Sequence, residues 1–356
     1  MTGARIKQAR IAAGMSLRDL AEKTNNYVSA QVIHKYELGK STPGSDVLIQ
    51  LSKALDVKME FFFRPLKSEI TLGKPIYRKR SSLSQKELAS IQAKVKDSLE
   101  KYVEVEGLFP DDRFPKFKLP PKKGRKIRSL EEIEQFSREL REEWALGIDP
   151  VERLTEILED RGVKVVTIDA KRDFDGLSCW ANETIPAIVV RKTQESDRMR
   201  LSLAHELGHL LMDISPSVDT EKAAHRFAGA FLVPEEAARQ ELGDSRNRFS
   251  SFELLSLREK YGMSVQAWIY RAYDLKIISH SFFVQFVRFL KAKGLFEKEL
   301  GKKLKPEEPK RFKRLVIQAV EEKLISESKG AEMLDISLPE LRNMLEVGAL
   351  SEELHS

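Results

Sequence analysis

LSLAHELGHLLMD, residues 201–213, contains the most informative pattern of this chain. Its apolar positions recur at helical spacing, which predicts a buried helix. His205 and His209 are four residues apart, so both imidazoles leave the same face of that helix and can bind one metal ion. Glu206 points about 100° away around the helix, where it can accept a proton from water without binding the metal. The spacing therefore predicts a metal centre on a buried helix.

This His-Glu-x-x-His arrangement is the one found in zinc peptidases, and in a chain with six histidines it arises by chance on the order of one time in a hundred. The alternative, two histidines that only fill a core, is disfavoured because both rings and the glutamate would need unrelated buried partners. Gly208, between the histidines, predicts a close approach by another backbone. A catalytic zinc usually takes three protein ligands and leaves a fourth position open, so a third ligand is required.

Glu221, twelve residues beyond the second histidine, offers that ligand. It begins a predicted helix in which Phe227 is a buried position, so this helix can cross the first one. We therefore expect Zn2+ to be bound by His205, His209 and Glu221. His225 lies one turn after Glu221, and it either supports the ligands from behind, replaces one of them or faces solvent.

A second pattern occupies residues 14–63, GMSLRDLAEKTNNYVSAQVIHKYELGKSTPGSDVLIQLSKALDVKMEFFF. Short helical periods are separated by turn signals, which predicts about five short helices. The run resembles the XRE, or Cro/C1-type, helix-turn-helix family over about the first 65 residues. In this arrangement Leu17, Leu20 and Ala21 of one helix are expected to pack against three apolar positions of the next: Val32, Ile33 and Tyr36.

The resemblance implies that the second of these helices enters the major groove of operator DNA. Gln31, His34 and Lys35 are then the candidates for base contacts, and Ser16 at a helix N-terminus can hold a phosphate. Residues 1–67 carry eleven Lys/Arg against six Asp/Glu, which favours a phosphate-facing surface. A small bundle that makes only protein contacts is the alternative. The turn at residues 24–28 is about two residues longer than is usual in the family.

Composition sets the frame for both patterns. The chain has 356 residues, of which 41% are hydrophobic and 33% charged, as expected for two or three globular domains. It has a single cysteine and a net charge of +6, which exclude an internal disulfide and permit nucleic-acid binding. No apolar run approaches the ~20 residues of a membrane span, and the N-terminus lacks the apolar core of a signal peptide. We therefore expect a cytoplasmic protein with no membrane partner.

The expected fold class is mainly α with a small β-sheet (α+β), a helix-turn-helix bundle followed by a zincin-like domain. Three β-rich runs predict the sheet: VKVVTID at 163–169, LSCWAN at 177–182 and AIVVRK at 187–192. Four segments are expected: a helix-turn-helix domain at 1–67, a linker with one amphipathic helix at 68–128, a peptidase domain at 129–280 and a C-terminal helical region at 281–356. Residues 110–128, rich in proline and lysine, are expected to be exposed.

Residues 144–275 resemble the ImmA/IrrE family of bacterial metallopeptidases. Four stretches carry the resemblance: WALGIDP, DFDGLSCW, RMRLSLAHELGHLL and EKAAHRFAGAFLVP. It implies that Glu221 is a metal ligand in an ExxAN element, in which His225 here replaces the usual asparagine. It also implies that the partners are XRE-type repressors, which family members cleave.

Ser178 lies in a DGLS motif that also matches this family and precedes a predicted strand. An exposed strand edge there can align a substrate peptide by strand addition, with Ser178 as a substrate-binding residue. It is equally expected that Leu177, Cys179 and Trp180 fill the core. Cys179 is not expected to be a nucleophile, because no histidine lies near it in the sequence.

Together these patterns predict a DNA-binding regulator with a zinc-dependent peptidase domain in which Glu206 is the general base. The expected substrate is a repressor-type protein, either another chain or the same one. The alternative is a transcription factor or antitoxin whose zinc domain senses a ligand or partner and cleaves nothing. The amphipathic helix after Ser84 is either a connector or the seam of a homodimer. Residues 325–337 have the rhythm of a second helix-turn-helix, and a packing role is favoured for them.

Overall fold

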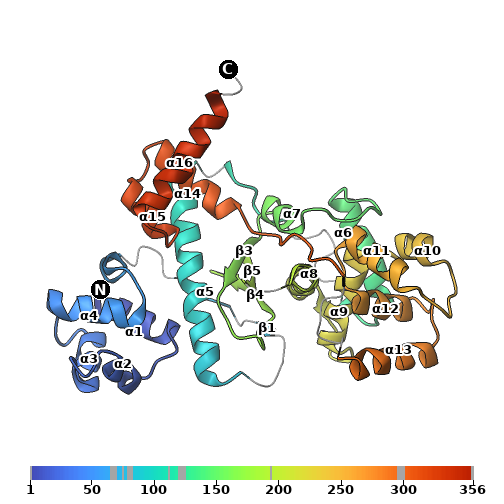
Figure 1. The fold of residues 1–356 in the computed structure, drawn as a ribbon, viewed down its shortest axis with the longest axis horizontal. Helices are drawn as coiled ribbons and strands as arrows, with labels where there is room; N and C mark the ends of the chain where they lie inside the picture. The colour runs from blue at the N-terminus through green and yellow to red at the C-terminus, as the bar shows by residue number, and fades with distance from the viewer. Residues whose placement is uncertain are drawn as a thin grey trace. The chain divides into compact units, whose positions relative to one another are not determined.

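The computed structural model confirms a mainly helical fold with a small sheet (Figure 1). It describes residues 2–64, 70–73, 76–77, 83–110, 113–118, 126–192, 195–294 and 301–353. None of the helices in this described part is long and apolar enough to cross a membrane. The chain divides into two compact units. The first comprises Met1–Thr71, Ser81–Phe114 and Lys310–Ser356, and the second comprises Leu72–Arg80 and Pro115–Pro309.

The first unit begins with the predicted short helices. They are α1 (Thr2–Ala12), α2 (Leu17–Lys23), α3 (Ala30–Glu37), α4 (Ser45–Leu55) and the 3-10 helix η1 (Met59–Phe63). Ser16 starts α2 in a capping box, and Ser29 caps α3 through the N–H of Val32. Leu20 and Ile33 are fully buried in one core, which confirms the predicted packing of α2 on α3.

The long turn between α2 and α3 is built by two asparagines. Asn25 and Asn26 have φ values of 52° and 55°, in the left-handed region. Asparagine enters this region more readily than other residues with a β-carbon. The two additional residues therefore reverse the chain without shifting Ile33 out of the core.

Later segments complete the first unit: α5 (Gln85–Glu106), α14 (Arg311–Glu321), α15 (Glu327–Met333) and α16 (Leu338–Glu353). Ser84 caps α5 as predicted, and Ile91, Val95 and Leu99 of its apolar stripe are buried. Farther along the helix, Tyr102 packs in one cluster with α14. Since α5 also contacts α1, its apolar side is covered within the chain and is not a free dimer seam.

Buried ion pairs join α5 to the N-terminal helices of the first unit. Arg5 of α1 pairs with Glu100 at 2.7 Å, and Arg64 pairs with the same carboxylate at 3.3 Å and also with Asp97. Lys101 of α5 also pairs at 2.6 Å with Asp335 after α15, but the Asp335 side chain is 77% exposed, so only the lysine end of this pair is buried. These charges are satisfied only if α5 stays against its neighbours, because an unpaired buried charge costs several kcal/mol.

The second unit contains a four-stranded sheet in the order β1-β4-β5-β3. Strands β3 (Lys164–Ile168), β4 (Gly176–Ala181) and β5 (Ile185–Arg191) confirm the three predicted runs. β4 is antiparallel to β5, and β3 is parallel to it. β1 (Ile76–Tyr77) extends the sheet beyond β4. Two-residue strands such as β1 carry no period that a sequence pattern can reveal.

A parallel pair of short strands, β2 (Lys126–Ile127) and β6 (Asp213–Ile214), lies outside this sheet. Ile127 is buried, so the end of the stretch that we expected to be an exposed linker is part of the folded unit. The expectation of exposure was wrong there because a strand pairing outweighs the local proline and lysine content. Residues 111–112 and 119–125 of the expected linker lie outside the described residues.

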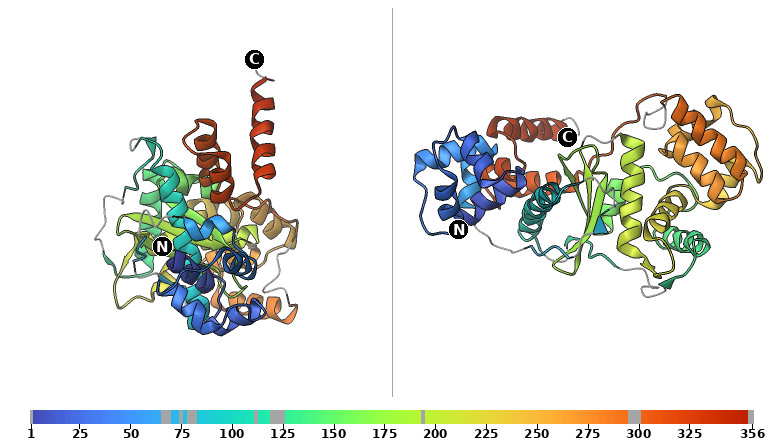
Figure 2. Two further views of the ribbon diagram at one scale, coloured as in Figure 1. Left: turned by 90° about the vertical axis from the view of Figure 1, so that its left-hand side faces the viewer. Right: turned by 90° about the horizontal axis from the view of Figure 1, so that it is seen from below.

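Helix α8 (Ser196–Leu211) lies between the sheet and helix α9 (Thr220–Leu232) (Figure 2). Fourteen of its residues are buried, since it is covered on both sides. The remaining helices of this unit are α6 (Glu131–Glu143), α7 (Leu154–Asp160), α10 (Glu235–Leu242), α11 (Ser251–Tyr261), α12 (Val265–Asp274) and α13 (His280–Ala292). α6 and α12 pack on α9, and Trp268 of α12 is completely buried.

Candidate metal centre

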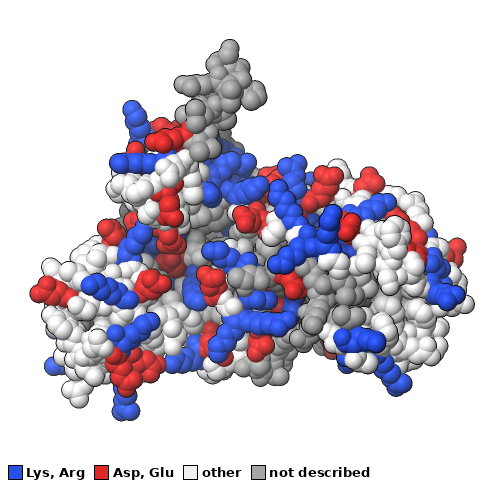
Figure 3. Space-filling model, viewed as in Figure 1, with Lys and Arg blue, Asp and Glu red and all other residues white. Residues whose placement is uncertain are grey.

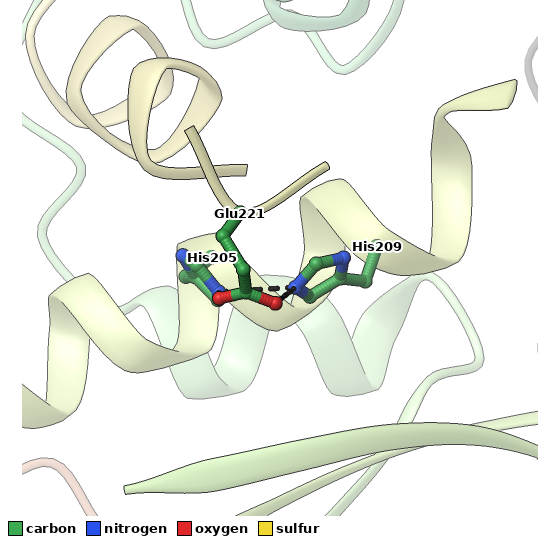
Figure 4. A group of neighbouring side chains, drawn as sticks. All are labelled: His205, His209 and Glu221. Atoms are coloured by element: carbon green, nitrogen blue, oxygen red, sulfur yellow. Dashed lines mark hydrogen bonds and ion pairs between the residues drawn. The ribbon is translucent and has the colours of Figure 1, made fainter. Parts of the chain in front are cut away.

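Helix α8 places the two histidines of the motif on one face, as their spacing predicts. His205 is 1% exposed and His209 is 7% exposed. Their Nε2 atoms lie 3.0 Å apart, so both rings converge on one point (Figure 4).

Glu221 reaches the same point from the first turn of α9. Its two carboxylate oxygens lie 3.4 Å from the Nε2 atoms of His205 and His209, respectively. Asp219 fixes the start of α9 by accepting a hydrogen bond from the N–H of Lys222. Within the described residues, His205, His209 and Glu221 form a group whose ligand atoms all lie within 4.8 Å of one another, close enough to hold one metal ion.

The three donors match the geometry of zinc. Ligands about 2.0–2.2 Å from a tetrahedral zinc lie roughly 3.3–3.5 Å from one another, close to the observed 3.0 and 3.4 Å separations. Two imidazoles and one carboxylate are also a donor set that zinc accepts. The side chain of Glu221 is 35% exposed, so the centre is open on one side, as a catalytic site requires.

Electrostatics keep Glu221 charged. Burial by itself raises the pKa of this carboxyl group, but its hydrogen bonds and electrostatic interactions with the two histidines outweigh burial and hold its pKa well below the usual range. The carboxylate is therefore in the form that binds a cation.

Gly208 governs how closely α8 and α9 cross. A β-carbon at this position would lie 2.8 Å from Cδ1 of Phe227 and 3.1 Å from Cε of Met212. We expected the glycine to allow a close approach by another segment, and the ring of Phe227 on α9 is the neighbour that comes nearest. Phe227 lies six residues after Glu221 on α9, so this contact also sets the distance of Glu221 from the histidines.

Glu206, the residue after His205, contacts strand β4. Its Oε2 accepts a hydrogen bond of 2.9 Å from the hydroxyl of Ser178, and both residues are almost completely buried. Gly176 leaves room for the carboxylate, since a β-carbon there would lie 3.2 Å from Cγ of Glu206. The sequence motif indicated Ser178 but gave no sign that Gly176 has this steric role.

The DGLS segment is fixed to α8 by charge as well. Asp175, which is 3% exposed, forms an ion pair of 2.7 Å with Arg198 in the first turn of α8. The strand edge next to this segment is not exposed, contrary to our expectation, because β1 pairs with β4 at Ser178 and Leu177. The prediction that β4 lies near the edge of the sheet was correct, but β1, about a hundred residues earlier in the chain, pairs with that edge.

His225 and Cys179 are the other polar candidates near the centre. His225 is exposed, and its ring lies 4.4 Å from that of His205, centroid to centroid, so it contacts a candidate ligand. Cys179 is buried in β4, and burial together with the charge of Glu206 raises the pKa of its thiol to about 12. A thiol with this pKa stays protonated and is a poor nucleophile near pH 7.

The candidate DNA contacts lie on helix α3. Gln31, His34 and Lys35 are all exposed, on the side of the helix opposite the buried Ile33. Ser16 is used for capping: its hydroxyl accepts from the N–H of Asp19, whose carboxylate accepts from the N–H of Ser16 in return. On the face shown in Figure 3, acidic and basic side chains are interspersed over these N-terminal helices.

Two family comparisons agree with this division of the chain. Residues 6–62 match the family described as Helix-turn-helix, and residues 158–273 match a peptidase family described as the IrrE N-terminal-like domain. No curated protein matches the chain significantly. The protein therefore joins a DNA-binding domain to a peptidase-like domain. More narrowly, the first is an XRE-type helix-turn-helix domain and the second an ImmA/IrrE-like domain, which confirms both resemblances.

Proposed function

We propose that this protein is a transcriptional regulator that binds operator DNA and whose second domain is a zinc-dependent peptidase acting on a repressor-type protein. The observation that carries the proposal is the convergence of His205, His209 and Glu221 on one point, on the helix that also carries Glu206. Because the first domain binds DNA, we expect the protein to act in the cytoplasm.

Each residue of the candidate site has a separate role in peptide hydrolysis. His205, His209 and Glu221 would hold zinc, which when bound supplies a Lewis acid for a peptide carbonyl and makes a water molecule more acidic. Glu206 accepts the proton of the attacking water and delivers it to the leaving amine. Ser178 orients that carboxylate through its 2.9 Å hydrogen bond, and so acts on the general base, with no direct contact to substrate required. His225 positions the ring of His205.

DNA binding is assigned to α3. Gln31 can pair with adenine through two hydrogen bonds, and Lys35 and His34 can reach base edges or phosphates. The N-terminus of α2 at Ser16 can bind a phosphate of the DNA backbone. The Asp19 carboxylate at that N-terminus opposes a phosphate there, so α3 is the stronger candidate.

The test compares three variants for cleavage of a repressor-type protein and for induction of a reporter. Glu206→Gln keeps the size and polarity of the side chain but removes the base, so it should bind zinc and DNA normally while cleavage falls ~10²- to 10⁴-fold. His205→Ala should lose both zinc and cleavage. Glu195→Gln is the matched control, because this glutamate is exposed at the start of the same helix and forms no side-chain cap.

A sensor that cleaves nothing gives a different pattern. Its output depends on metal occupancy and shape, so Glu206→Gln would induce the reporter fully and His205→Ala would not. That result, with no repressor fragment on a blot in any lane, would refute the peptidase and establish the sensor.

A further inference from the structure

A lysine outside the matched helix-turn-helix region lies against the first helix of the motif. The family match covers residues 6–62, whereas Lys86 belongs to the first turn of α5. Its Nζ lies 2.7 Å from the carboxylate of Asp19 in α2. Both helices belong to the first compact unit, so this pair is internal to that unit. The surface around α2 therefore includes a side chain that the family match does not contain.

The start of α5 is held in this place by contacts that do not involve Lys86. The hydroxyl of Ser90, one turn farther along α5, donates a hydrogen bond to the carbonyl of Ala12 at the end of α1. Deeper in the helix, Glu100 forms its buried ion pair with Arg5 of α1. Lys86 is therefore carried to α2 by a helix that is fixed elsewhere, and its own side chain remains 57% exposed.

Asp19 is an acidic group on the helix that DNA approaches. It is the third residue of α2, and the first helix of a helix-turn-helix motif crosses the phosphate backbone. The hydrogen bond from Lys86 and the one from the N–H of Ser16 hold the pKa of Asp19 well below its usual range. Asp19 therefore stays charged and by itself repels phosphate, and the ammonium group of Lys86 offsets that charge.

The ammonium group of Lys86 also has donors left for a second partner. A lysine carries three N–H donors, and the hydrogen bond to Asp19 uses one of them. The acidic neighbour Glu87 is engaged in the cap of α5, where its carboxylate accepts from the N–H and the hydroxyl of Ser84. An exposed cation with donors to spare thus lies beside the helix that crosses the DNA backbone.

We propose that Lys86 binds a phosphate of the DNA backbone and so extends the DNA interface of this protein from the helix-turn-helix domain to the first turn of α5. The proposal rests on the DNA binding assigned under the proposed function. The partner is the phosphate backbone of duplex DNA, whatever its base sequence. Asp19 is a positioning residue, because its hydrogen bond holds the ammonium group beside α2.

The test measures binding of the full-length chain to a labelled duplex of random sequence, by fluorescence anisotropy over a salt series. Each phosphate contact contributes ~0.9 to the slope of log affinity against log salt concentration. Lys86→Gln removes the charge and should make this slope shallower by ~0.9, with weaker binding at low salt. Lys86→Arg keeps the charge and should keep the slope of the parent. Lys96→Gln is the matched control, because it makes the same change about 15 Å farther along the same helix and should leave the slope unchanged.

Asp19→Asn separates contact with DNA from mere neutralisation of Asp19, since asparagine keeps an acceptor for the N–H of Ser16 but carries no charge. Direct contact predicts that Lys86→Gln lowers the slope by ~0.9 in this background as well. Equal slopes for Lys86→Gln and Lys96→Gln, or disappearance of the difference with Asp19→Asn, would overturn the proposal. The two proposals fail in different ways. A parent that binds no duplex even at low salt refutes DNA binding altogether, whereas a parent that binds with a slope insensitive to Lys86→Gln refutes only the role of Lys86.

Discussion

Replacing Gly208 by alanine tests whether the crossing of α8 and α9 sets the metal centre. The added methyl would lie 2.8 Å from Phe227, whose ring is completely buried, stacks on Phe231 and touches Phe136. Since the ring has no space to turn away, the overlap must be relieved by separating the helices. Overpacking of this kind costs about 1–3 kcal/mol, whereas alanine in place of glycine within a helix gains about 1 kcal/mol. We expect a net loss of stability of up to ~2 kcal/mol.

Gly229 provides the matched control on the crossing helix. A β-carbon there would meet only Cδ of Arg271, at an ordinary 3.4 Å. Gly229→Ala should therefore show the helix gain alone and stabilise the protein by up to ~1 kcal/mol. The two alanine variants should differ by about 1–3 kcal/mol in the free energy of unfolding.

Zinc affinity gives the second readout. Separation of the helices moves Glu221 away from the histidines, so Gly208→Ala should bind zinc more weakly in competition with a chelator, while Gly229→Ala binds like the parent. Urea denaturation of the zinc-free proteins measures stability independently. If both variants matched in stability and in zinc affinity, the inferred role of the Gly208–Phe227 contact would be wrong.

Three further outcomes are expected. Gln31→Ala with Lys35→Ala should reduce the preference for operator over random duplex more than total affinity, and an unchanged ratio over a salt series would exclude α3 as the reading helix. Glu221→Ala should lose zinc, whereas His225→Ala should retain it with affinity reduced only ~10- to 100-fold; metal analysis showing the reverse would exchange their roles. Burial raises the pKa of Glu134, but hydrogen bonds and charges of its arginine partners outweigh burial, so the pKa is lowered overall. The Glu134 carboxylate therefore stabilises the fold above about pH 4.3, and this stabilisation is lost as the pH falls. Glu134→Gln should therefore flatten the loss of stability in acid, measured by thermal melts at stepped pH.

The parts of this fold that repeat a period were predictable from the sequence. Periodicity predicted the helical runs ending in Met212 and Leu232 and the three long strands, because in each of them apolar residues recur on one face of the element. The convergence of His205, His209 and Glu221 was also accessible, since the spacing of the histidines fixes two donors and the amphipathic pattern of α9 supplies a third.

Other features depend on contacts between distant residues, which no local pattern contains. β1 is too short to have a period, and its partner strand is about a hundred residues away. The steric role of Gly176 appears only when Glu206 is placed beside it. Likewise, α5 shows an apolar stripe whatever covers it, so its sequence fits an intermolecular seam as well as the observed packing on α14.

The state of Cys179 has a practical consequence for spectroscopy. Since this is the sole cysteine of the chain and lies buried with a strongly raised pKa, the native protein offers almost no reactive thiol to a maleimide or a spin label. A cysteine introduced at an exposed position, such as Lys35 on α3, would then be labelled selectively without mutating the background. Single-site fluorescence and electron-resonance measurements are therefore possible with Cys179 in place, because Cys179 becomes reactive only when the sheet unfolds.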